Sequence, residues 1–182
     1  NKTIGVFRNH AKNMGVGWLQ LDYYLLYAIQ MLYITEYGHG DSQTMIGRGY
    51  VDGNSSARVT GGTLQYGNKT FGETTGKQQM SYRGIEDFWG NGYDLIDGLY
   101  SDGSRNILIG NKGFNNTGVG YENIGQGANY NTFGYIGDIQ PHEKAGFIFK
   151  VGGGGSSSSK LYDYCFLYAS RVPYFGGNWN DG

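Results

Sequence analysis

The chain has 182 residues and a formal net charge of −1, with 14 basic and 15 acidic side chains. This length predicts one domain with a sizeable core, and the near-neutral charge predicts neither a nucleic-acid partner nor an anionic membrane surface. A single cysteine, Cys165, excludes an internal disulfide and a cysteine-based metal cluster, and no apolar run reaches the ~20 residues of a membrane-spanning helix. We therefore expect no membrane insertion.

The first expected element is a strand that carries Ile4, Val6 and Phe7. A long helix is expected after Asp22, whose carboxylate can accept a backbone N–H at the helix start. This helix should end near Tyr37, because the following Gly38 favours a helix stop. Apolar side chains on nearly every face predict that it is the main core helix, buried on most sides.

The next stretch, Gly38–Gly53, is rich in loops. His39 and Asp41 could suggest a metal site or a catalytic dyad, but no second histidine lies nearby, so a hydrogen-bonded loop is expected. The Thr-, Tyr- and Gly-rich segments Ala57–Gly67 and Lys69–Lys77 are expected to form short strands and a surface loop.

The centre of the chain is the aromatic stretch Tyr82–Gly98, which we interpret as a structural core motif. Ile85, Phe88 and Trp89 have helical spacing, so one short helical turn is predicted. Residues 90–92, Gly-Asn-Gly, should break that turn because both residue types tolerate positive φ. The alternation that begins at Tyr93 then predicts a short strand.

Several strands are expected in the second half. The turn sequence SDGSR, residues 101–105, predicts a hairpin between the segments Leu95–Tyr100 and Asn106–Gly110. The further predicted strands are Gly134–Ile139, Ala145–Val151 and Tyr162–Ala169, the last continued by residues 170–172. Gly152–Ser159 is interpreted as a surface loop; the Gly-Lys-Ser/Thr pattern of a phosphate-binding loop is absent from it.

Three segments together resemble a known family. They are GWLQLDYYLLYAIQMLYITEY at Gly17–Tyr37, YRGIEDFWGN at Tyr82–Asn91, and SRVPYFGGNW at Ser170–Trp179, in that order. This pattern resembles the phage and bacterial variable proteins of the C-type-lectin fold, the major-tropism-determinant-like proteins that retroelements diversify. FWGNGYDLIDG also resembles the G-N-x-W-E-W segment of formylglycine-generating-enzyme-type domains, with Tyr93 and Leu95 in place of the two tryptophans.

The resemblance implies an α+β, C-type-lectin-like fold with one main buried helix, short antiparallel strands and long Gly/Asn/Tyr-rich loops. It implies one domain over residues 1–182 that lacks its C-terminal closing segment. It also implies a receptor-binding domain on a phage tail fibre, or on a bacterial surface, that recognises a host cell-surface protein or glycan. A homo-oligomer, with a trimer favoured, would add avidity.

In the related proteins the variable, ligand-facing residues lie near the C-terminus. The residues this places in the expected binding face are Tyr162, Tyr164, Tyr168, Tyr174, Phe175, Asn178, Asn180 and Asp181. Tyrosine suits such a face, since its large ring gives contact area at a low entropic cost. Trp179 and Arg171 are expected to be structural instead, with the tryptophan buried and the arginine paired.

Two alternatives share this fold. One is a structural tail protein of the virion that binds no ligand. The other is an enzyme, which would need paired cysteines or clustered histidines, whereas Cys165 is alone and His10, His39 and His142 are far apart. The acidic pairs Glu86/Asp87 and Asp94/Asp97 could imitate a glycosidase, but acids in loops are usually caps or turn residues. We therefore expect no enzymatic activity, no cofactor and no metal.

Overall fold

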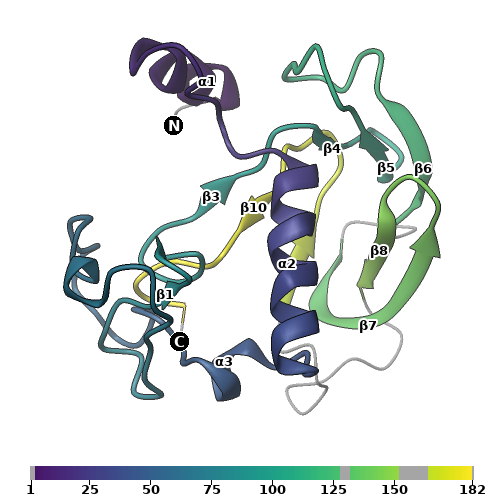
Figure 1. Cartoon of the computed structure of the whole chain (residues 1–182). Coiled ribbons are helices and arrows are strands. Elements are labelled where there is room, and N and C mark those ends of the chain that lie inside the picture. The colour runs from purple at the N-terminus through teal and green to yellow at the C-terminus, as the bar shows by residue number, and fades with distance from the viewer. Residues whose placement is uncertain (1–2, 128–131, 152–163, 182) are drawn as a thin grey trace. The chain divides into compact units, whose positions relative to one another are not determined.

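The computed structural model describes residues 3–127, 132–151 and 164–181. It is a mixed α/β structure with few helices and short antiparallel strands, as the sequence predicts at that level (Figure 1). The chain forms two compact units. Unit 1 comprises Asn1–Gly38 and Leu95–Pro173, and unit 2 comprises His39–Asp94 and Tyr174–Gly182.

Unit 1 contains the predicted long helix, α2 (Tyr23–Tyr37). The Asp22 carboxylate accepts a hydrogen bond from the Leu25 N–H at 3.0 Å, and Gly38 closes the helix in the left-handed conformation with φ 61°. Both predicted helix signals are therefore confirmed.

The predicted N-terminal strand is wrong, because α1 (Ile4–Asn13) is a helix. The alternation of Ile4 and Val6 suggested a strand, yet only Ile4 of this helix is buried. Arg8, one helical turn later, reaches the carboxylate of Asp97 with its Nε at 2.6 Å. The spacing of four residues places Ile4 and Arg8 on one face of the helix. The pairing of Arg8 with Asp97 is long-range, so a local sequence pattern does not indicate it.

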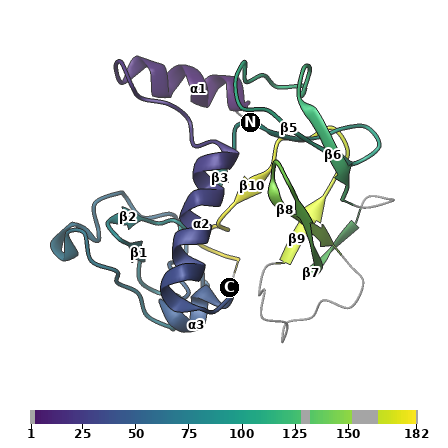
Figure 2. The same ribbon diagram turned by 45° about the vertical axis from the view of Figure 1, so that its right-hand side comes forward.

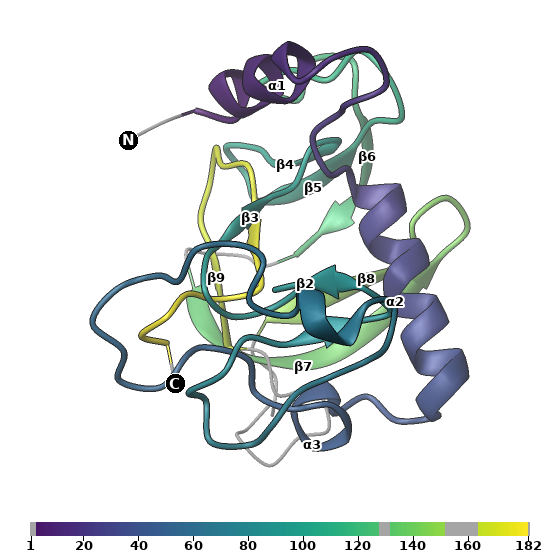
Figure 3. The same ribbon diagram turned by 60° about the vertical axis from the view of Figure 1, so that its left-hand side comes forward.

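Two antiparallel three-stranded sheets complete unit 1. The first has the order β4 (Leu99–Ser101), β5 (Asn106–Ile109), β6 (Glu122–Gln126) (Figure 3), and the second has the order β8 (Gly146–Val151), β7 (Thr132–His142), β9 (Tyr164–Leu167). The predicted β4–β5 hairpin is confirmed by the pairing of Tyr100 with Leu108. The predicted strands around β7 and β8 are confirmed, whereas β9 ends at Leu167, earlier than predicted, and Ser170 has φ 58°. Gly152–Ser159 lies outside the described residues.

The core of unit 1 lies where α2 meets these strands. Ile109, Ile124 and Ala145 are buried together, with Tyr23 packed against them. The Tyr23 hydroxyl donates to the carbonyl oxygen of Ala145 at 2.8 Å, which fixes the start of α2 against the β7–β8 turn (Figure 2). Burial raises the pKa of Tyr23 to about 12, and the neighbouring tyrosines add to the shift.

The expectation that α2 is buried on most sides is wrong. Its buried residues are Leu26, Ile29 and Tyr33, whereas Leu25 and Leu32 remain 52% and 56% exposed. The helix carries its own apolar side chains on nearly every face, but the other described residues pack against only one of these faces. Composition alone therefore overestimated its burial.

Unit 2 is built mainly from loops and turns. Its elements are the helix α3 (Ser42–Met45), the 3-10 helix η1 (Leu64–Tyr66), the paired strands β1 (Ser81–Tyr82) and β2 (Ile85–Glu86), and the strand β10 (Tyr174–Phe175). β3 (Asp94–Leu95), part of the strand predicted from Tyr93, spans the point where the chain passes from unit 2 to unit 1. His39 and Asp41 do form a hydrogen-bonded turn, since the Asp41 N–H donates to His39 Nδ1 at 3.0 Å.

Two predictions about unit 2 are wrong. The expected helical turn at Ile85–Trp89 is instead β2 followed by a turn, because Arg83 and Asp87 adopt positive φ angles of 50° and 53° that end a helix. Among the described residues of 57–77, no strand forms, and turns with η1 take its place. The core interpretation of the central stretch is sound, since Tyr82 is 1% and Phe88 5% exposed.

Candidate functional site

The candidate site is an exposed aromatic and polar surface in unit 2, which we call the tyrosine face: Tyr93, Tyr174, Asn178 and Asp181. Tyr174 is 66% exposed and Tyr93 is 50% exposed. Their ring centroids lie 5.6 Å apart at an interplanar angle of 33°. Two large rings that touch each other yet remain open to solvent form a ready contact surface.

Polar groups border the two rings. Burial together with the Asp181 carboxylate raises the pKa of Tyr93 to about 12. Asp181 Oδ2 also accepts the Asn178 N–H at 2.8 Å. The tyrosine therefore stays neutral across the physiological pH range, and the face offers hydroxyl, amide and carboxylate groups beside its rings.

The C-terminal segment is held by backbone contacts within unit 2. The Gly90 N–H donates to the Gly176 carbonyl at 2.5 Å, and the Phe175 ring packs on Phe88 with centroids 5.1 Å apart. Gly176 and Gly177 adopt φ angles of 95° and 72°, which turn the chain sharply after β10. The segment is thus anchored before and within the turn that carries Asn178 and Asp181.

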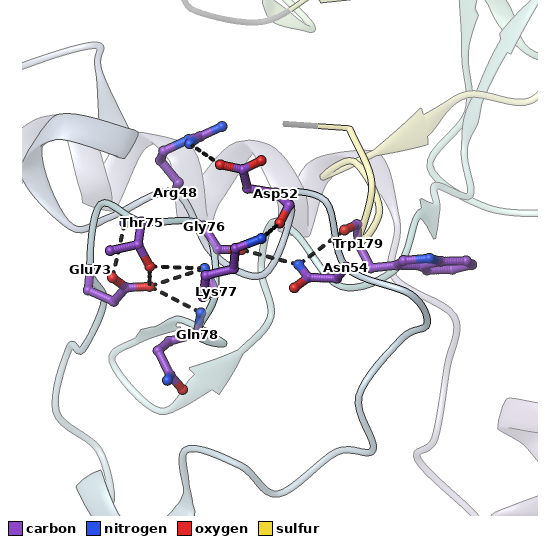
Figure 4. Close-up of polar contacts among 9 residues, drawn as sticks. All are labelled: Arg48, Asp52, Asn54, Glu73, Thr75, Gly76, Lys77, Gln78 and Trp179. Atoms are coloured by element: carbon purple, nitrogen blue, oxygen red, sulfur yellow. Dashed lines mark hydrogen bonds and ion pairs between the residues drawn. The ribbon is translucent and has the colours of Figure 1, made fainter.

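A further anchor joins this segment to a loop at residues 73–78 (Figure 4). Asn54 Nδ2 donates both to the Trp179 carbonyl at 3.1 Å and to the Gly76 carbonyl at 3.2 Å. In the picture the Trp179 ring points away from these bonds. Trp179 is only partly buried, so the expectation that its ring is buried is wrong, and the residue is held through its backbone.

The 73–78 loop is itself ordered by one carboxylate. Glu73 accepts hydrogen bonds from the Thr75 hydroxyl at 2.6 Å and from the backbone N–H groups of Thr75, Lys77 and Gln78 (Figure 4). Partial burial opposes ionisation, but these bonds outweigh it and lower the pKa of Glu73. The ionised Glu73 carboxylate, with its hydrogen bonds from Thr75, Lys77 and Gln78, therefore stabilises this loop. The Gly76 carbonyl of the same loop accepts the hydrogen bond from Asn54.

Glu86 and Asp97, one member of each acidic pair that could imitate a glycosidase, are occupied in structural bonds. Glu86 accepts the N–H groups of Gly61 and Thr63, each at 2.5 Å, and the Thr63 hydroxyl. Asp97 is paired with Arg8. These two carboxylates act as loop and helix anchors.

Asp87 and Asp94 have a different environment. Asp87 Oδ2 accepts bonds from Gln79 at 2.7 Å and from Asn91 at 2.8 Å, while its Oδ1 is buried without a hydrogen-bond partner among the described residues. Burial raises the pKa of Asp87. Burial, aided by the charge of Asp87, raises the pKa of Asp94 from 3.8 to about 6.

This environment predicts a pH effect on stability. A folded-state pKa above the unfolded value means that the folded protein binds more protons, so stability falls as pH rises from about 4 to about 6. Asp94→Asn should therefore raise the free energy of unfolding at pH 7 by on the order of 1–2 kcal/mol, after allowance for solvent screening. Urea unfolding at pH 4 and pH 7 measures the gain, which should nearly vanish at pH 4.

The exposed acid Glu143 supplies the matched control, since Glu143→Gln should leave the pH profile of the parent unchanged. An Asp94→Asn gain that is as large at pH 4 as at pH 7 would contradict the assignment of the effect to Asp94 ionisation.

The predicted site residues are only partly brought together. Tyr174, Phe175, Asn178, Asn180 and Asp181 lie in one C-terminal segment of unit 2, with Phe175 turned toward Phe88. Tyr168 is 44% exposed and belongs to unit 1. Tyr162 and the side chain of Tyr164 lie outside the described residues. Arg171, expected to be paired, is exposed, and its Nη1 donates to the adjacent Ser170 carbonyl at 3.0 Å.

Tyr93 is the site residue that the sequence interpretation missed. The dense aromatic residues of Tyr82–Gly98 place it in the expected core motif. The available signal was its position directly after residues 90–92, since a Gly-Asn-Gly break turns the chain outward; Asn91 indeed has φ 63°.

Within the described residues, no group of three or more His, Cys, Asp or Glu side chains has the arrangement of a metal site. Among the helices of that same part of the chain, none is long and apolar enough to cross a membrane. Comparison with protein-family models, with curated proteins and with solved structures finds no match to this chain.

Proposed function

We propose that this chain is a receptor-binding domain of C-type-lectin-like fold, displayed on a phage tail fibre or a bacterial surface. In this proposal the tyrosine face contacts a cell-surface protein or glycan. The observation that carries it is the contacting pair Tyr93 and Tyr174, each at least half exposed. Tyrosine is enriched in binding surfaces, because its large ring gives contact area at a low entropic cost.

The chemistry of the tyrosine face suits polar ligands with a flat apolar side. Aromatic rings stack on the C–H faces of sugars or on apolar side chains, while Asn178 and Asp181 supply hydrogen-bond donors and acceptors next to them. A preorganised surface also loses little conformational entropy on binding. The anchors at Gly176 and at the Trp179 carbonyl supply that rigidity.

The enzymatic alternative receives less support, because Glu86 and Asp97 are saturated by structural partners. A trimeric arrangement, as the resemblance implies, would multiply a weak single contact through avidity.

The test is the substitution Tyr174→Ser. We expect it to weaken binding of the labelled protein to a panel of intact bacterial cells and immobilised bacterial glycans by about tenfold or more, since loss of an aromatic anchor costs about 1–3 kcal/mol. Flow cytometry and a glycan array measure the two arms. Tyr174 is exposed, so the melting temperature should change little.

Trp18→Ser is the matched control, because Trp18 is 57% exposed and belongs to unit 1. Binding that survives Tyr174→Ser, or that falls equally with Trp18→Ser, would refute the role of the tyrosine face. A parent protein that binds no member of the panel would favour the ligand-free structural protein.

A further inference from the structure

A second candidate site lies wholly in unit 1, in a hollow of about 420 Å³. It opens where β5 ends at Ile109 and where β6 begins at Glu122, beside the first turn of α2 and the β7–β8 turn. The volume is in the range of small-molecule sites in proteins. Its chemistry-bearing lining is Tyr24, Asn111, Lys112, Glu122 and Lys144.

The charges in the hollow do not cancel. Lys144 Nζ forms a two-pronged ion pair with Glu122, at 2.7 Å and 2.9 Å from the two carboxylate oxygens, and this contact raises the pKa of Lys144. Lys112 is exposed and has no hydrogen-bond or ion-pair partner among the residues that the structure describes. Glu143 also acts on Lys144. Among the lining residues themselves, Lys112 is a positive charge without a carboxylate partner, and an anionic group can approach it.

One wall of the hollow is aromatic. Tyr24 is 37% exposed, and its ring meets Tyr23 edge-on with centroids 5.7 Å apart. The hydrogen bond from the Tyr23 hydroxyl to the Ala145 carbonyl fixes Tyr23, and the fixed Tyr23 ring limits the movement of the Tyr24 ring that contacts it. A supported, half-exposed ring is a stacking platform for a flat apolar surface.

Two of the residues that line the hollow are glycines. A Cβ at Gly120, where φ is 81°, would meet no atom within 4 Å, so this position faces open space. A Cβ at Gly110 would lie 2.5 Å from the Tyr121 ring, so no larger residue fits there. Asn111, which also lines the hollow, has a side-chain amide that can both donate and accept hydrogen bonds. This part of the lining therefore offers backbone and amide groups to a ligand.

We propose that this hollow binds an acidic sugar unit, with the sugar ring on Tyr24, its hydroxyls at Asn111 and its carboxylate at Lys112. The ligand class follows from the combination of one net positive charge, an aromatic platform and an amide in one small, open hollow. Each feature alone would suit many ligands, but together they match a carboxylated monosaccharide. The site is independent of the tyrosine face, which belongs to unit 2.

The test uses D-glucuronate and D-glucose, which differ only in the carboxylate at carbon 6. Amide shifts of the ¹⁵N-labelled full chain, followed by NMR during titration, should show glucuronate binding with a dissociation constant on the order of 1 mM. Shifts should centre on residues 110–112, 120–122 and 144. Glucose should bind at least about tenfold more weakly, and 0.5 M NaCl should weaken glucuronate binding.

Lys112→Gln should weaken glucuronate binding by about tenfold and leave glucose unaffected. Lys12→Gln, at an exposed lysine of the same unit outside the hollow, is the matched control and should change neither. Equal binding of glucose, equal binding of acetate, or glucuronate shifts outside these residues would each overturn the proposal. Tyr24→Leu gives a second reading, since it should weaken binding while the salt dependence stays.

Discussion

Replacing Arg8 by methionine is expected to lower the free energy of unfolding by about 3–5 kcal/mol. The Arg8 side chain is 15% exposed and that of Asp97 is 3% exposed, with Nε and Oδ2 2.6 Å apart. Removing the arginine leaves a buried carboxylate without its counter-charge, which costs far more than the pair itself contributes. Urea unfolding followed by circular dichroism measures the loss.

The same experiment separates charge from packing. Methionine keeps most of the apolar stem of arginine, so Arg8→Met removes mainly the charge. Lys12→Met is the control: Lys12 lies on the exposed side of α1, and this substitution should change the free energy of unfolding by less than about 0.5 kcal/mol. The double variant Arg8→Met, Asp97→Asn should recover part of the loss, because no buried charge then remains. A loss that the second substitution does not reduce would show that the ion pair is not its source.

This pair also explains why the N-terminal segment misled the sequence interpretation. Nothing near Ile4 or Arg8 in the sequence indicates that Asp97, 89 residues away, will anchor the segment. The α2 helix could be predicted because its signals, Asp22 and Gly38, are local and adjacent to it. The β4–β5 hairpin was predictable for the same reason, since its turn sequence joins the two strands directly.

The candidate site likewise contains residues that could be predicted from the sequence and residues that could not. Tyr174, Asn178 and Asp181 were expected in the binding face because the family resemblance implies a ligand-facing C-terminal region. Tyr93 was missed because the dense aromatic and apolar residues of Tyr82–Gly98 indicate a core segment, whereas Tyr93 is 50% exposed. The hollow beside Lys112 was missed as well, since its walls come from four separate stretches of the chain.

Unit 2 has few regular elements, so its stability depends on close backbone crossings. Ile46–Gly47 passes Gly72–Glu73 so tightly that a Cβ at Gly72 would lie 2.4 Å from the Ile46 carbonyl oxygen. The Arg48 N–H donates to the Glu73 carbonyl at 3.0 Å, and the Trp89 indole donates to the Gly47 carbonyl at 2.9 Å. This crossing positions Glu73, and through it the loop whose Gly76 carbonyl helps to hold Asn54.

Gly47→Ala is therefore expected to lower the free energy of unfolding by about 3 kcal/mol or more. Its Cβ would lie 2.4 Å from the Glu73 backbone nitrogen, and φ at this position is 142°, where a side chain is strained. Gly92→Ala is the control, because a Cβ there meets no atom within 4 Å and φ is not positive. Guanidinium unfolding should show a change below about 1 kcal/mol for Gly92→Ala. Equal stability of the two variants would mean that the crossing tolerates a methyl group and that unit 2 is held elsewhere.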